Sequence, residues 1–206
     1  GWLKETESLL TLFGRFEKDG TLPNMLIGEH GGNRDSSDAP LWYGLACDEY
    51  ALALAAPDGS AGTTRPSSAE SFYRKKIDST GRSIVDVLRS IAGSYLRGTP
   101  NGIRVDPSSG LVWSPSHFTW MDTNFPPCSP REGFPIEIQA LWIRLLRQLE
   151  NLNVPPVAER WGILADRALE SMDRLFWLEK KGWFADVLLA PAGQPATAAR
   201  PDEALR

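Results

Sequence analysis

Cysteine and histidine are scarce in this sequence, which has two of each among its 206 residues. Cys47 and Cys128 lie far apart, and neither has a cysteine or histidine at a spacing that suits a metal ligand. We therefore expect no metal site, no other cofactor and no disulfide framework. Reduced thiols are typical of the cytoplasm, and residues 1–5 lack the basic and apolar regions of a signal peptide, so we expect a cytoplasmic protein.

An excess of basic residues and a long apolar run are also missing. The chain has 22 Lys plus Arg against 26 Asp plus Glu, a net charge of -4, and no basic block that could follow a phosphate backbone. The longest apolar runs, such as residues 45–56, are interrupted by Asp48 and Glu49 and fall short of the roughly 20 residues of a membrane span. We expect neither nucleic acid nor a membrane as a partner.

The spacing of apolar residues predicts helices over residues 2–16, 38–56, 67–96, 135–149 and 157–177. Asp38 can cap the second helix, and Pro40 suits its first turn. The third helix is predicted to be interrupted at residues 79–81, where a new helix cap can begin. Pro155-Pro156 separates the last two helices. Three tryptophans lie at helical spacing on apolar faces: Trp142, Trp161 and Trp177. We predict that they belong to the core rather than to a binding site.

Strand patterns are rare. Only Ile103–Val105 and Leu111–Trp113 are spaced like a small hairpin, while residues 180–184 are predicted as a turn and residues 190–199 as a loop. Residues 98–130 form a long aperiodic stretch with several aromatic residues, which is typical of a functional loop. The fold class is predicted to be all-α. Paired helices with long loops suit a toroid of α-hairpins, although helix packing equally permits a simpler bundle.

Polar and aromatic residues concentrate in two segments, residues 33–42 and 119–123. Sugars present apolar C–H faces and many hydroxyls, so their sites combine flat aromatic rings with carboxylates and amides. Tryptophan lies near aspartate in both segments. The pattern therefore indicates a carbohydrate site.

Glycoside hydrolysis usually requires one carboxylic acid and one carboxylate. Asp122 lies near Trp120, whose shielding would give it the raised pKa that a general acid needs. From the residues alone, Asp38 is equally suited to capping a helix and Asp122 to organising a turn. Both alternatives stay open at this point.

A series of ordered motifs spans nearly the whole chain. They are Leu22-Pro23-Asn24, residues 33–42, Trp120-Met121-Asp122, residues 129–133, residues 137–142, residues 182–186 and Ala204-Leu205-Arg206. Together they resemble the amylo-α-1,6-glucosidase domain of glycogen-debranching enzymes. Several motifs in this order make the resemblance specific.

The resemblance implies an (α/α)6 barrel, a toroid of the six-hairpin glycosidase type. It also implies an inverting glycoside hydrolase that removes α-1,6-linked glucose at the branch points of glycogen, a related branched α-glucan or a limit dextrin. Asp122 then corresponds to the general acid, while Asp38 lies in a region that grips the non-reducing glucose; the reverse assignment is open. The candidate substrate-binding residues are Asn33, Arg34, Asp35, Trp42, Trp120, Arg131 and Glu137. Arg131 and Glu137 are expected to bind either sugar or each other.

By the same resemblance, we expect residues 1–206 to form the central portion of an incomplete barrel, with its start and end missing. The family's second catalytic carboxylate lies well beyond the matching segment, so the base is expected outside this chain. The fragment would then be inactive alone. The alternatives are a catalytically incomplete glucan-binding fragment and a helical-barrel glycosidase of other specificity.

Overall fold

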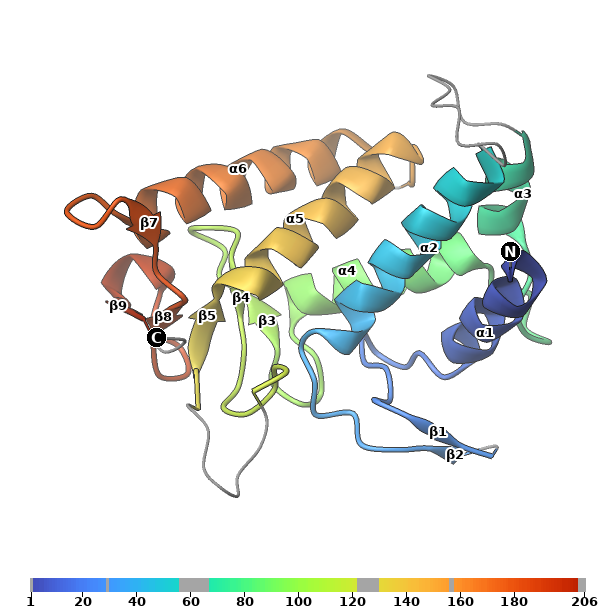
Figure 1. The fold of residues 1–206 in the computed structure, drawn as a ribbon, viewed down its shortest axis with the longest axis horizontal. Coiled ribbons are helices and arrows are strands. Elements are labelled where there is room, and N and C mark those ends of the chain that lie inside the picture. Colours follow the sequence, from blue (N-terminus) through green and yellow to red (C-terminus); the bar gives the residue numbers. More distant parts are fainter. Residues whose placement is uncertain (1, 29, 56–66, 122–129, 156–157, 204–206) are drawn as a thin grey trace.

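The computed structural model describes residues 2–28, 30–55, 67–121, 130–155 and 158–203. Six α-helices dominate this part of the chain (Figure 1). They are α1 (Leu3–Arg15), α2 (Ala39–Ala55), α3 (Ser67–Arg74), α4 (Ile84–Arg97), α5 (Ile136–Asn151) and α6 (Ala158–Phe176). The helices predicted from apolar spacing are confirmed to within a few residues at their ends.

The predicted interruption of the third helix is a complete break between α3 and α4. Gly81 has a φ of 81°, a left-handed conformation that glycine adopts without steric cost. Helix α4 then restarts with a capping box, in which the Ser83 side chain accepts from the Asp86 amide and the Asp86 carboxylate accepts from the Ser83 amide. Local capping therefore fixes where α4 begins.

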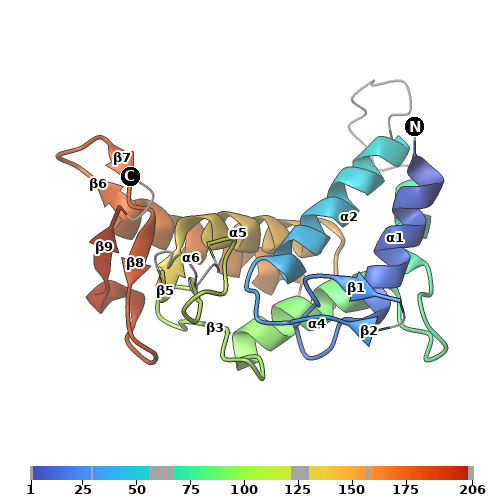
Figure 2. The same cartoon turned by 60° about the horizontal axis from the view of Figure 1, so that its bottom comes forward.

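Helix α5 lies at the centre of the packing. It forms a hairpin with α6 and also contacts α2 and α4 (Figures 1 and 2). Trp142 of α5 is fully buried, stacks on Tyr95 of α4 at 5.8 Å between ring centroids, and donates from Nε1 to the Gly110 carbonyl at 3.0 Å. This tryptophan joins two helices and one loop in a single core.

The predicted hairpin is confirmed: β3 (Arg104–Val105) pairs with β4 (Val112–Trp113) in antiparallel register. The expectation of an all-α fold holds only in part, because three further small antiparallel sheets accompany the helices. They are β1 (Leu26–Ile27) with β2 (His30–Gly31), β6 (Trp177–Leu178) with β7 (Trp183–Phe184), and β5 (Gly133–Pro135) with β8 (Val187–Leu189) and β9 (Arg200–Asp202). Strands of two or three residues are too short to show an alternating pattern.

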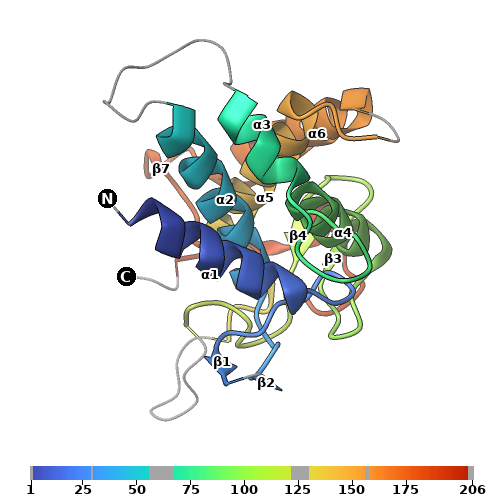
Figure 3. The ribbon, with the colours of Figure 1, turned by 90° about the vertical axis from the view of Figure 1, so that its right-hand side faces the viewer.

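Two groups of strands lie at the edges of the helical body. The β1–β2 hairpin lies below α1 in the view of Figure 3, whereas β6 to β9 lie at the end of the molecule opposite α1 (Figure 2). Among the described residues, no helix combines the length and apolar character needed to cross a membrane. Closure of these helices into a toroid stays a prediction.

Two of the three tryptophans predicted to lie in the core are buried, and one is exposed. Trp142 and Trp161 are buried core residues, as predicted. The prediction for Trp177 is wrong: its side chain is 42% exposed, and Phe176 holds the buried position instead. Helix α6 ends at Phe176, so the next residue leaves the helical face and enters the β6–β7 hairpin, where its ring meets Phe184 edge-on.

Candidate functional site

A pocket of about 470 Å³ lies between α1, the first half of α2 and two loops. Its wall includes four of the residues predicted to form the site, although they come from two distant segments of the sequence. The lining residues are Leu9, Leu10, Phe13, Leu22, Pro23, Asn24, Asp35, Ser36, Asp38, Ala39, Trp42, Tyr43, Ala46, Thr119 and Trp120. We call this the Trp42–Trp120 pocket.

Two tryptophans give the pocket its exposed aromatic surface. Trp42, in the first turn of α2, is 52% exposed, and Trp120, in the long loop, is 62% exposed. Large aromatic side chains normally bury most of their area, so two exposed indoles on one pocket are unusual for a purely structural role. Their free faces suit stacking against an apolar sugar face.

Asp38 has two roles at the start of α2. Its carbonyl oxygen accepts the first helical hydrogen bond, from the Trp42 amide at 2.8 Å. Its carboxylate Oδ1 accepts from Ser36 Oγ at 2.5 Å, and Ser36 Oγ in turn accepts from the Ala39 amide at 3.0 Å. The serine therefore caps the helix, and Asp38 Oδ2 has no hydrogen-bond partner among the described residues. One carboxylate oxygen at the pocket is thus available to a ligand.

A buried network of hydrogen bonds to Ser37, the residue before Asp38, fixes the position of Asp38. The Tyr95 hydroxyl donates to the Ser37 carbonyl at 2.9 Å, and the Ser37 hydroxyl shares a 2.7 Å hydrogen bond with that of Ser114. The Ser37 amide donates to the Phe118 carbonyl at 2.6 Å. Burial, with the nearby charge of Asp38, raises the pKa of Tyr95. These bonds tie the Asp38 turn to the loop that carries Trp120.

Asp35 is an exposed carboxylate at the pocket wall. The side chain of Asn33 accepts from the Asp35 amide at 3.0 Å, which forms a local turn, and the Asn33 carbonyl accepts from the Asn24 amide at 2.8 Å. Asn33 itself does not line the pocket. In the structure it shapes the loop that presents Asp35.

Arg34 does not line the pocket. Its guanidinium donates from Nη1 to the carbonyl and the hydroxyl of Thr21, both at 3.1 Å, and from Nη2 to the Phe16 carbonyl at 2.8 Å. Asn101 donates to the Arg34 carbonyl at 2.9 Å. These contacts hold the site loop against the end of α1.

Arg131 and Glu137 bind each other in a two-pronged ion pair. Arg131 Nη2 lies 2.6 Å from Glu137 Oε2, and Nη1 pairs with Oε1. Arg131 is only 1% exposed, and it also donates to the hydroxyl of Thr119 at 3.2 Å and to the Asp186 carbonyl at 3.0 Å. Neither member of the pair lines the Trp42–Trp120 pocket, but Thr119 does. The pair therefore anchors the loop one residue before Trp120.

Asp122, the residue predicted as general acid, lies outside the described residues, as do Cys128 and Ser129. Only Met121 separates Asp122 from Trp120 in the sequence. Among the described residues, no group of three or more His, Cys, Asp or Glu side chains could hold a metal ion. Cys47 is buried, which raises the pKa of its thiol and disfavours the reactive thiolate.

Sequence reasoning missed several residues that build the pocket. Leu9 and Phe13 of α1 form part of its wall, yet their helical spacing indicated only a core stripe. Ser36 was not distinguished from its polar neighbours, because its role depends on the fold of one turn. Tyr95 is far from either segment in the sequence, so no local signal could reveal that it supports Asp38.

Exposed indoles beside carboxylates on a mainly helical domain are typical of a carbohydrate-binding protein. Comparison with protein families gives a more particular result: residues 1–205 match the family described as amylo-alpha-1,6-glucosidase. The chain therefore belongs to this family, as its ordered motifs predicted. Comparison with curated individual proteins gives no match.

Proposed function

We propose that this chain forms part of a glycoside hydrolase that removes α-1,6-linked glucose from the branch points of glycogen, a related α-glucan or a limit dextrin. Family membership supports a glycosidase-related function. The observation that carries the proposal is the convergence of Trp42, Trp120, Asp35 and Asp38 on one pocket. A volume of about 470 Å³ falls within the range of pockets that bind small ligands and suits a terminal glucose.

In this proposal the two indoles stack on the sugar ring, and the carboxylates of Asp35 and Asp38 accept hydrogen bonds from its hydroxyls. Asp122 acts as the general acid and protonates the glycosidic oxygen as the bond to the anomeric carbon breaks. In an inverting enzyme a second carboxylate, acting as base, takes a proton from water, whose oxygen attacks from the opposite face of the ring. We propose that this base belongs to a part of the barrel outside residues 1–206.

The remaining candidate residues act through others in this account. Arg34 secures the loop of Asp35, with Asn33 shaping its turn. The Arg131–Glu137 pair holds Thr119 next to Trp120. We propose that they are positioning residues, whose loss disturbs the geometry of the pocket without removing a contact to the sugar.

Glucose release from a branched limit dextrin tests the proposal, measured with the protein that carries this chain. Asp122→Asn is expected to lower kcat at least about 100-fold, because general acid catalysis contributes typically 10²–10⁴-fold, while dextrin binding persists. Asp38→Asn is expected to raise KM more than it lowers kcat. Asp173→Asn, an exposed change on α6, is the matched control and should leave both constants unchanged.

Full turnover by Asp122→Asn would overturn the assignment of the acid. A large kcat loss in Asp38→Asn, with Asp122→Asn active, would reverse the two roles. Dextrin binding without any glucose release by the unaltered protein would favour the alternative of a catalytically incomplete glucan-binding protein, and release of glucose only from another linkage would indicate a different specificity.

A further inference from the structure

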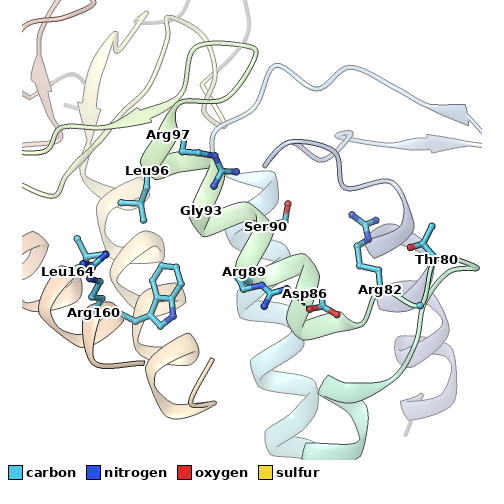
Figure 4. A pocket seen from close by; sticks show the side chains of 12 residues that line it. Thr80, Arg82, Asp86, Arg89, Ser90, Gly93, Leu96, Arg97, Arg160 and Leu164 are labelled. Carbon is cyan, nitrogen blue, oxygen red and sulfur yellow. Dashed lines mark hydrogen bonds and ion pairs between the residues drawn. The ribbon is translucent and has the colours of Figure 1, made fainter. Parts of the chain in front are cut away.

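A second and larger pocket, of about 750 Å³, lies between α4 and α6 (Figure 4). It shares no lining residue with the Trp42–Trp120 pocket. One wall is formed by α4 from Asp86 to Arg97, and the other by the first part of α6. At a rise of 1.5 Å per residue, the α4 wall is about 16 Å long. We call this elongated pocket the α4–α6 groove.

Four arginines line the groove, and two of them already have carboxylate partners. Arg82 Nη1 lies 2.6 Å from Glu17 Oε2, and Arg89 Nη2 lies 2.8 Å from Asp86 Oδ1. The positive charge of these two arginines is therefore compensated within the fold.

The other two arginines, Arg97 and Arg160, are exposed, and neither has a carboxylate partner within the part of the chain that the structure describes. Among the described residues, Arg97 donates only to the Ser94 hydroxyl, at 3.2 Å, and Arg160 makes no hydrogen bond or ion pair. They lie on opposite walls of the groove (Figure 4). In a chain with a net charge of -4, the groove thus holds two cations that have no carboxylate partner among the residues described.

Gly93 leaves space for the side chain of Arg97. A Cβ atom built at Gly93 would lie 3.0 Å from Arg97 Nη1, so a side chain there would crowd the guanidinium. The absence of that side chain leaves room for the arginine to lie along α4 at the groove (Figure 4). The hydrogen bond from Arg97 Nη2 to the Ser94 hydroxyl supports this position.

Apolar side chains lie between the cations. Leu96, 38% exposed, comes from α4, and Leu164 and the buried Trp161 come from α6. A neutral glucan offers no charge for the arginines. A compact anion such as phosphate would favour cations that converge on one point, whereas these come from opposite walls of an elongated groove.

We propose that the α4–α6 groove binds an acidic, amphipathic segment of a partner polypeptide. Carboxylates of that segment pair with Arg97 and Arg160, and its apolar side chains contact Leu96 and Leu164. A helical segment that fills a groove through residues spaced three and four apart is a common mode of peptide recognition, and a groove of about 16 Å accommodates roughly three helical turns.

The probe is a fluorescein-labelled peptide of about 12 residues, built only of glutamate and leucine with the leucines spaced three and four apart to form one helical face. Fluorescence anisotropy at low salt measures its affinity for the protein. Arg97→Glu and Arg160→Glu are each expected to weaken binding about tenfold, equivalent to about 1.4 kcal/mol. Raising the salt concentration should weaken the wild-type affinity, because exposed charges are screened.

Arg174→Glu is the matched control, since it makes the same charge change at an exposed position of α6 outside the groove. It should change the affinity less than about twofold. The neutral substitutions Arg97→Gln and Arg160→Gln, with thermal unfolding followed by circular dichroism, separate a loss of the site from a loss of the fold.

Several results would overturn the proposal. One is the absence of saturable binding to the wild type, and another is an equal loss of affinity in Arg174→Glu. The third is equal affinity for a peptide in which glutamine replaces every glutamate. Displacement of the peptide by submillimolar inorganic phosphate would instead assign the groove to a small anion and would also contradict a polypeptide partner.

Discussion

The buried hydroxyl of Tyr95 donates a 2.9 Å hydrogen bond to the carbonyl oxygen of Ser37, the residue directly before Asp38. Tyr95 lies in the middle of the core, stacked on Trp142, so the position of a pocket carboxylate is set by the most buried part of the molecule. The link joins the packing of α4 and α5 to the geometry of the Trp42–Trp120 pocket.

Tyr95→Phe should weaken both stability and sugar binding. It keeps the ring but leaves the Ser37 carbonyl without its buried donor, which typically costs about 1–3 kcal/mol. Urea unfolding should show this loss, and calorimetry should show weaker binding of a branched maltooligosaccharide. An unchanged sugar affinity in a destabilised variant would separate Tyr95 from the pocket.

Glu17→Gln should destabilise the fold strongly. The Glu17 side chain is fully buried and accepts from the Gly20 amide at 2.9 Å, from Arg82 Nη1 at 2.6 Å and from Ser90 Oγ at 2.8 Å. Arg82 is partly exposed and keeps Asp78 as a partner, so we expect a loss of about 1–3 kcal/mol from the buried acceptor groups of Glu17. Urea unfolding measures the change, with Glu70→Gln as the control because the Glu70–Arg74 pair is exposed. Equal effects of both variants would contradict the account.

Glu137→Gln should reduce stability and sugar affinity together. It removes the charge that pairs with the buried guanidinium of Arg131, which also holds Thr119 beside Trp120. We expect a loss of about 3 kcal/mol in unfolding free energy and a several-fold weaker affinity for a branched maltooligosaccharide. Glu170→Gln, an exposed change on α6, should alter neither quantity. Loss of affinity without loss of stability would instead favour direct contact of Glu137 with sugar.

Glu7 makes the stability depend on pH at the acid end. The hydrogen bond from Lys75, followed by that from Tyr50, holds the pKa of Glu7 below its ordinary value of 4.5. A folded-state pKa below the unfolded one contributes stability above pH 4.5, and this stability is lost as the pH falls through the folded value. Glu7→Gln should therefore be less stable than the wild type near neutral pH, and the difference should shrink in acid. Urea midpoints across this range test it, and a constant difference would refute it.

The sequence predicts the parts of this structure that depend on local signals. Asp38 and Pro40 indicate the start of α2, glycine and serine indicate the break before α4, and the Trp-rich segments indicate the pocket to which Trp42 and Trp120 both contribute. Family motifs predict the family that the comparison shows. Each of these signals is contained in a few consecutive residues.

Features that depend on distant pairing were not predictable in this way. In the sheet of β5, β8 and β9, residues 187–189 lie between residues 133–135 and residues 200–202, and no strand exceeds three residues. Arg34 lies among candidate sugar contacts in the sequence, but its hydrogen bonds run back to Phe16 and Thr21. The direction of a long side chain is decided by tertiary contacts, which residue type and spacing do not encode.

Isothermal titration calorimetry with a maltooligosaccharide that carries one α-1,6-linked glucose tests the central claim, that the Trp42–Trp120 pocket holds sugar. Trp42→Ala and Trp120→Ala should each weaken binding about tenfold, since stacking on an indole contributes roughly 1 kcal/mol or more beyond buried area. Trp177→Ala, which removes an exposed indole outside the pocket, should leave the affinity unchanged. Wild-type affinity in both pocket variants, or an equal loss in Trp177→Ala, would contradict the account.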